Sequence, residues 1–183
     1  MRRPSPVASA AADTAHFFFN TGFYDMADTN EQPLFSIEKL YLKDASFESP
    51  NAPTVFQTTV QPTIEVDINL NTRQVDEGLY AVELALTCTA AIAAAAAQDD
   101  EQDKTTYFLV EVVQGGLFTL RHIPEQDLGP LLGIECPNIL FPYARQVVAS
   151  LTADGGFRPV LLNPVNFAAM YREQQHRQPA DPA

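Results

Sequence analysis

The sequence predicts an α+β fold, with a four-stranded antiparallel sheet and helices packed on one of its faces. Apolar and polar residues alternate along four segments that end before Pro124. Beyond Pro124 the alternation stops, and apolar residues recur at helical spacing. Strands followed by helices are typical of an antiparallel sheet whose helices gather on one side. The length of 183 residues suits one domain with its own core and additional terminal segments.

The first strand is expected over residues 35–47. The parity of its apolar residues switches between Ile37 and Leu40, which allows a β-bulge there. Residues 49–53 read Ser-Pro-Asn-Ala-Pro and end the strand, because two prolines interrupt regular structure. A crossover loop then leads to Pro62.

The next two strands form a predicted hairpin. From Ile64 to Asn71 branched apolar residues alternate with acidic or amide residues, so one face is buried and the other is wet and acidic. Residues 79–92 repeat the alternation. The polar triplet 76–78, Asp-Glu-Gly, supplies the turn between them.

The last strand is expected over residues 106–121, after an alanine-rich and acidic loop at residues 93–103. Phe108 and Val110 lie on one face of this strand, whereas Leu109 lies on the other. Because both faces carry apolar residues, we expect helices to cover one face and a partner to cover the other.

Helical periodicity predicts a short helix or turn over 124–132, a main helix over 138–153 and a second helix over 164–176. The main helix begins in a region with two prolines. Either Pro137 or Pro142 can open it, because proline is tolerated in a first helical turn.

Three segments complete the predicted organisation of the chain. Residues 1–33 have no sustained periodicity and are expected to be a disordered extension, residues 34–177 form the folded domain, and residues 178–183 form a flexible tail. Met26 begins a string typical of a cytosolic N-terminus, which raises the hypothesis that residues 1–25 are an upstream extension.

Composition limits the classes of function. Eleven basic residues against 23 acidic ones give a net charge of −12, which repels nucleic acid and favours a partner with a basic surface. Cys88 and Cys136 are far apart in sequence and predict neither a disulfide framework nor a zinc site, so a reduced, cytosolic protein is expected. The chain contains no apolar run close to the ~20 residues that a membrane helix needs.

No motif predicts catalysis, a cofactor or a metal. The three histidines have no second ligand at helical spacing, and the Gly-Gly pairs lack the context of a phosphate-binding loop. The strand carboxylates, such as Glu65 and Glu111, are explained by a solvated sheet face. Two alternatives stay open: a face that docks a basic segment with an apolar anchor at Leu109, and a small enzyme that uses the acidic face.

Four blocks carry a resemblance to a known family. They are KDASFESPNAP at residues 43–53, EVVQGG at 111–116, CPNILFPYAR at 136–145 and PVNF at 164–167. In this order, over residues 34–171, they resemble the SecB export chaperones. The resemblance implies a cytosolic homotetramer, a dimer of dimers, that holds secretory precursors unfolded and passes them to the motor ATPase SecA. It implies neither catalysis nor a nucleotide site.

The resemblance also implies three groups of site residues. The motor-docking residues correspond to Asp44, Glu48, Leu109 and Glu111, which would meet the basic, zinc-bearing tail of SecA. The tetramer interface corresponds to Val110, Val112 and Gln114. The client groove corresponds to Phe56, Val60, Ile64 and Val66, where relatives often carry tryptophan at the position of Val60. A chaperone of this scaffold that serves one toxin–antitoxin system is the alternative function.

Overall fold

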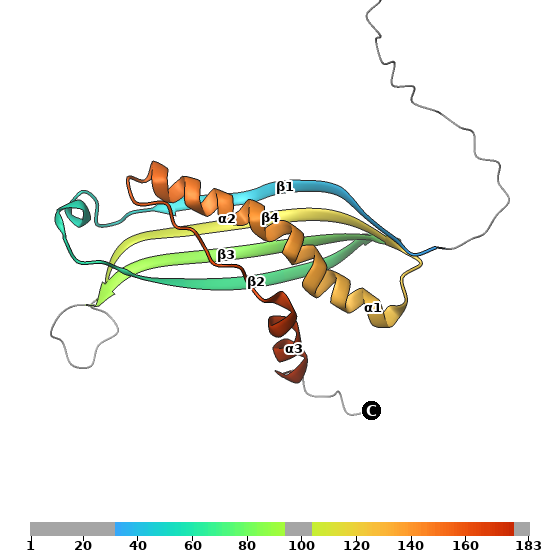
Figure 1. The fold of residues 1–183 in the computed structure, drawn as a ribbon. Coiled ribbons are helices and arrows are strands. Elements are labelled where there is room, and N and C mark those ends of the chain that lie inside the picture. The colour runs from blue at the N-terminus through green and yellow to red at the C-terminus, as the bar shows by residue number, and fades with distance from the viewer. Residues whose placement is uncertain (1–31, 94–103, 178–183) are drawn as a thin grey trace, which may run out of the picture. The chain divides into compact units, whose positions relative to one another are not determined.

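The computed structural model describes residues 32–93 and 104–177 (Figure 1). Its strands are β1 (Leu34–Glu48), β2 (Thr63–Asp76), β3 (Leu79–Ala93) and β4 (Lys104–Arg121). Its helices are η1 (Thr54–Gln57), α1 (Glu125–Pro130), η2 (Leu131–Glu135), α2 (Cys136–Asp154) and α3 (Phe167–Arg177). The predicted α+β class with strands before the main helices is confirmed.

The sheet has the order β1-β4-β3-β2, and every neighbouring pair is antiparallel. β1 and β2 are therefore the two edge strands. Helix α2 lies across one face of the sheet, which we call the covered face (Figure 1). No helix of the described residues packs on the other face, which we call the open face.

The core lies between α2 and the two central strands. Alternate residues of β3 and β4 point to the covered face and are buried with the inner side of α2. Burial of one such valine or leucine side chain stabilises the fold by about 1.5–3 kcal/mol. The fully buried members of this layer include Val82, Leu84, Leu86, Phe118, Leu140 and Val148.

Two register shifts interrupt the ladder between β1 and β4. The first lies between Ile37 and Lys39, where the sequence predicts a bulge. The second lies between Leu42 and Asp44, makes Lys43 an extra residue, and was not predicted. Each extra residue reverses which face the following side chains occupy, because strand side chains alternate.

The main helix begins earlier than predicted. Helices α1, η2 and α2 follow one another without a break, whereas the sequence predicts non-helical residues between 132 and 138. The π-helical segment η2 lies between Pro130 and Pro137, which interrupt the regular hydrogen-bond ladder because they have no N–H. Pro137 lies in the first turn of α2, and Pro142 lies inside the helix.

Helix α3 begins at Phe167 and not at Pro164. The backbone N–H of Ala169 donates to the side-chain oxygen of Asn166 over 2.9 Å, so Asn166 caps the helix. The segment between α2 and α3 crosses in front of the covered face (Figure 1).

Residues 1–31 of the predicted extension at 1–33, most of the loop at 93–103 and the tail at 178–183 lie outside the described residues, so these stay predictions. Ala93 is the last residue of β3. Within residues 32–93 and 104–177, no helix combines the length and hydropathy needed to cross a membrane.

Candidate functional site

The four predicted motor-docking residues come together on the open face. Asp44 and Glu48 lie on β1, and Leu109 and Glu111 lie on its neighbour β4. Glu48 is directly opposite Leu109, and Ser46 is directly opposite Glu111. The three carboxylates are exposed and follow one another along the two strands, with the half-buried Leu109 opposite Glu48 at one end, so the sheet presents a row of acidic side chains that ends in an apolar contact point.

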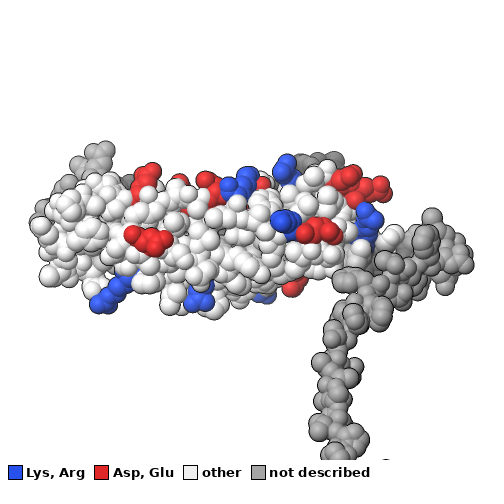
Figure 2. Space-filling view, turned by 90° about the horizontal axis from the view of Figure 1, so that it is seen from above, with Lys and Arg blue, Asp and Glu red and all other residues white. Residues whose placement is uncertain are grey.

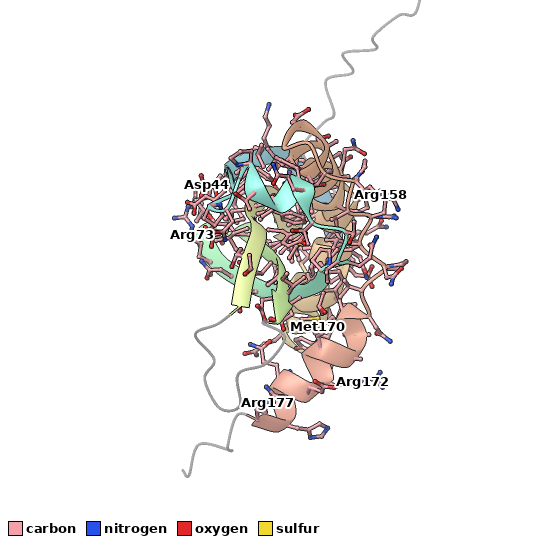
Figure 3. All side chains as sticks on the ribbon, turned by 90° about the vertical axis from the view of Figure 1, so that its left-hand side faces the viewer. Asp44, Arg73, Arg158, Met170, Arg172 and Arg177 are labelled. Carbon is pink, nitrogen blue, oxygen red and sulfur yellow. The ribbon has the colours of Figure 1, made fainter. Side chains whose placement is uncertain are left out.

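The rest of the open face is also acidic. Glu65, Asp67 and Glu83 share it, because their register partners are Thr89, Thr87 and Gly115. Figure 3 shows Asp44 and Arg73 on one side of the sheet and Arg158, from the segment after α2, on the other. Figure 2 shows acidic side chains gathered along one side, with lysines and arginines among them.

The carboxylates of this face are not equivalent. Glu83 is only 8% exposed, and the ammonium of Lys43 donates to its Oε2 over 2.7 Å. This charge is therefore neutralised within the chain. Glu111 is exposed and, among the described residues, no ion pair is recorded for it. Glu111 therefore presents an unneutralised negative charge on the open face.

The three residues predicted for the tetramer interface point to the covered face. Val110, Val112 and Gln114 are 0%, 1% and 4% exposed in the single chain, and α2 packs on this part of β4. The side-chain amide of Gln114 donates to the carbonyl oxygen of Tyr41 over 2.9 Å. These side chains support α2 and β1 from within the chain, and their interface role stays a prediction.

The four predicted client-groove residues are all exposed. Phe56 and Val60 lie on the crossover connection and are 52% and 56% exposed, whereas Ile64 and Val66 begin β2 and are 44% and 38% exposed. Ile64 and Val66 point to the covered face, opposite Ala90 and Cys88. They remain exposed because α2 packs over β4, β3 and β1 and leaves the edge strand β2 open.

An aromatic cluster closes one end of this apolar region, and the sequence reasoning missed its central residue, Phe157. The Phe157 ring lies 5.0 Å from Phe56, 4.9 Å from Phe108 and 6.2 Å from Phe47, measured between ring centroids. Such ring pairs stabilise by about 0.5–1.5 kcal/mol beyond the buried area. The sequence does contain a signal for this position. Phe157 directly follows the Gly-Gly pair that ends the helix, and an aromatic residue there can fold back on the core.

The apolar region continues along β2 to a cavity of about 300 Å³ beside α3. Ile68 and Leu70 form its floor, and Phe167, Met170 and Tyr171 of α3 contribute to its wall. None of these five residues was predicted as a site residue. The covered side of β2 is therefore apolar over much of its length.

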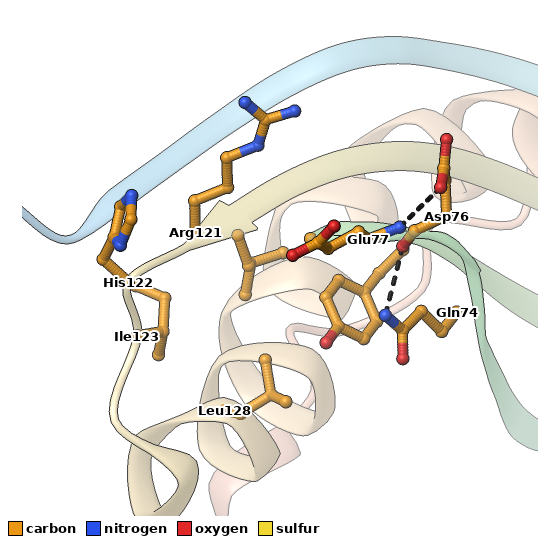
Figure 4. A pocket seen from close by; sticks show the side chains of 10 residues that line it. Gln74, Asp76, Glu77, Arg121, His122, Ile123 and Leu128 are labelled. Carbon is orange, nitrogen blue, oxygen red and sulfur yellow. Dashed lines mark hydrogen bonds between the residues drawn. The ribbon is translucent and has the colours of Figure 1, made fainter. Parts of the chain in front are cut away.

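A second cavity, of about 680 Å³, lies elsewhere, where the turn between β2 and β3 meets the start of α1 (Figure 4). Hydrogen bonds of the turn occupy its rim: the Gln74 amide donates to the Asp76 carbonyl over 3.1 Å, and the Glu77 N–H donates to the Asp76 carboxylate over 2.7 Å. No predicted site residue lines this cavity.

The two cysteines have no site chemistry. Cys88 and Cys136 are free and buried, and burial raises the pKa of Cys88 to about 11 and that of Cys136 to about 12. Their thiols are therefore protonated at neutral pH. Within residues 32–93 and 104–177, no group of three or more His, Cys, Asp or Glu residues is arranged to hold a metal ion.

Comparison with known proteins gives a consistent result. The model of the family described as preprotein translocase subunit SecB matches residues 28–178. The protein-export protein SecB of Methylococcus capsulatus is 46% identical over 164 residues, covering 86% of this chain and 99% of the relative. That of Chromobacterium violaceum is 48% identical over 147 residues, covering 80% and 91%.

A solved structure has the same fold at low sequence identity. It is a SecB-like chaperone of Mycobacterium tuberculosis in complex with a peptide from an antitoxin. The two chains superpose with a TM-score of 0.55 at 16% identity, over 72% of this chain and 91% of the other.

Proposed function

The chain belongs to the SecB family of protein-export chaperones, and from this premise we propose that it holds unfolded secretory precursors in the cytoplasm and delivers them to the SecA motor of the translocase. The observation that carries the proposal is the separation of two surfaces. The apolar region of β2 and the crossover loop faces one side of the sheet, and the acidic docking residues face the other.

Client binding follows from the exposed apolar side chains. Unfolded precursors present apolar and aromatic residues along extended segments, and burial of these on Phe56, Val60, Ile64 and Val66 is favourable at about 25 cal/mol per Å² of apolar surface. Many such contacts along one chain give avidity, while each contact can still release.

The backbone of β2 adds a second, sequence-independent contribution. Among the described strands β2 pairs only with β3, so its other edge presents unpaired N–H and C=O groups. An extended client segment can hydrogen-bond there and direct alternate side chains onto the apolar side. Backbone hydrogen bonds do not read sequence, which suits a chaperone of many clients.

Motor docking follows from the opposite charge of the partner. The family resemblance implies that SecA presents a basic tail whose fold is held by its own zinc. Asp44, Glu48 and Glu111 attract that tail, and Leu109 gives it an apolar contact that fixes its position.

Self-association into a dimer of dimers completes the proposal. Residues 138–153 of α2 contain one charged residue, Arg145, although the chain has 23 acidic residues. The exposed edge of β1 also carries Phe35, Ile37 and Leu42. A helix with few charges and an apolar edge strand are typical of surfaces buried between subunits. Val110, Val112 and Gln114 would influence this contact through α2, which they support.

The docking surface is tested by the charge reversal Glu111→Lys. We expect it to lower the affinity for SecA of the same bacterium by at least about a hundredfold, because it replaces attraction by repulsion at the centre of the face. Isothermal titration with SecA and with its zinc-loaded C-terminal peptide measures the effect. Client binding and oligomer mass should not change.

The matched control is Glu77→Lys. It makes the same change in net charge at the exposed turn between β2 and β3, away from the docking residues. We expect less than about a threefold change in SecA affinity, from the long-range field alone. Equal losses in the two variants would show that net charge, and not this surface, governs binding.

A further inference from the structure

We propose that the extra residue of β1, Lys43, is a positioning residue: its bulge, held by Glu83 and Gln114, determines that the two docking acids of β1, Asp44 and Glu48, lie on the open face. The inference rests on the proposed function, because it concerns the same docking surface. It adds residues that the docking set does not contain.

The argument begins with the register of β1. Leu42 is opposite Gln114 and points to the covered face, and after the extra residue Asp44 is opposite Val113 and points to the open face. With a continuous ladder, Asp44 would instead be opposite Val112 and point to the core. A shift of one residue moves every later side chain to the other face. The bulge therefore determines where Asp44 and Glu48 lie.

The first contact that holds the bulge is the ion pair between Lys43 and Glu83. The Lys43 ammonium reaches across β4 to Glu83 on β3 and donates over 2.7 Å. The position between them is Gly115, opposite Glu83, and a Cβ there would collide with the ring of Tyr41. Because Glu83 is 8% exposed, loss of the lysine would leave a nearly buried carboxylate unpaired, which is unfavourable.

The second contact lies on the covered face. A bulge disrupts the ladder locally and leaves backbone groups in need of other partners. The Gln114 amide donates to the Tyr41 carbonyl over 2.9 Å, two residues before the bulge. Gln114 is 4% exposed, so this hydrogen bond is sheltered from water. The backbone beside Lys43 is thus held from both faces of the sheet.

The pair Lys43→Met and Lys39→Met tests this inference. Both lysines lie on β1 among the open-face residues, and each change removes one positive charge from a face that binds a basic partner. Charge alone predicts slightly tighter SecA-peptide binding for both variants. The proposal predicts slightly tighter binding of the SecA peptide for Lys39→Met, as charge alone does, whereas Lys43→Met weakens binding roughly three- to tenfold. Equal or tighter binding by both variants would overturn it.

Two further measurements keep the outcome unambiguous. Lys43→Arg keeps the charge and should retain affinity within about twofold. Hydrogen exchange of the amides of residues 44–48 should accelerate in Lys43→Met and stay unchanged in Lys39→Met, whether or not the peptide binds. If Glu111→Lys has no effect on SecA binding, the assignment of the docking surface is wrong. Unchanged hydrogen exchange of residues 44–48 in Lys43→Met would reject the bulge proposal itself.

Discussion

At the scale of single residues, the open face shows that one residue type takes different roles according to its neighbours. Glu111 and Glu83 both point to this face, but Glu111 is exposed and Glu83 is nearly buried against Lys43. Alternation in the sequence places both on the same face and cannot separate them. The distinction depends on a lysine 40 residues away in the chain.

The buried cysteines give a prediction at this scale. Because burial raises the pKa of Cys88 to about 11 and of Cys136 to about 12, native thiols should react with iodoacetamide at pH 8 at least roughly a hundredfold more slowly than in urea. Mass spectrometry of the alkylated chain checks this. Native alkylation at the rate of free cysteine would contradict the burial.

The same thiols contribute to stability in a defined pH window. Since the folded pKa values exceed the ordinary value of 9.0, the unfolded chain loses these protons first as pH rises. Their contribution is complete below about pH 9 and is lost as pH rises through about 11 for Cys88 and about 12 for Cys136. A variant with both cysteines replaced by alanine should lack this part of the alkaline decline in urea midpoint.

At the scale of elements, strand β1 shows what the sequence predicts and where local pattern is insufficient. The change of parity from Ile37 to Leu40 correctly predicts the first bulge. The second parity change, from Leu42 to Phe47, spans charged and small residues and was overlooked. Its geometry depends on Glu83 and Gln114 of other strands, which no local pattern contains.

The helices, like β1, can be predicted only in part from local sequence pattern. The apolar spacing predicts the main helix, but its predicted beginning is too late, because a proline in the sequence is typical of a helix start. The π-helical segment η2 accommodates the hydrogen bonds that the prolines of this region cannot donate, so the helix continues past them. The aromatic position of Phe157 was missed because it depends on contacts with Phe47, Phe56 and Phe108, which are distant in the chain.

The docking of α3 gives a prediction at the scale of elements. Alanine is about 1 kcal/mol better than glycine inside a helix, so Gly133→Ala should stabilise η2 if nothing else changed. A Cβ at Gly133 would collide with the ring of Tyr171, however. We therefore expect faster hydrogen exchange in residues 167–177 and little change in the sheet.

The control is Gly133→Ala in a chain that also carries Tyr171→Ala. Without the ring the collision is absent, so Gly133→Ala should then be neutral or stabilising in urea unfolding. An equal loss of α3 protection by Gly133→Ala in both backgrounds would mean that Tyr171 does not hold α3.

At the scale of the whole molecule, the sheet separates the two proposed surfaces. Ile64 and Val66 point to the covered face at β2, whereas Asp44, Glu48 and Glu111 point to the open face at β1 and β4. The four sequence blocks predicted the family, and the family model matches residues 28–178. The separation itself could not be predicted from the spacing of residues, because it depends on strand order and on the bulge.

The most direct test of the account is whether client and motor bind at the same time. Light scattering coupled to gel filtration gives the mass of the chain alone, with a reduced unfolded precursor, with SecA, and with both. We expect a tetramer alone and a ternary complex with both partners, because the two surfaces lie on opposite faces. Displacement of the precursor by SecA without any ternary complex would contradict the account.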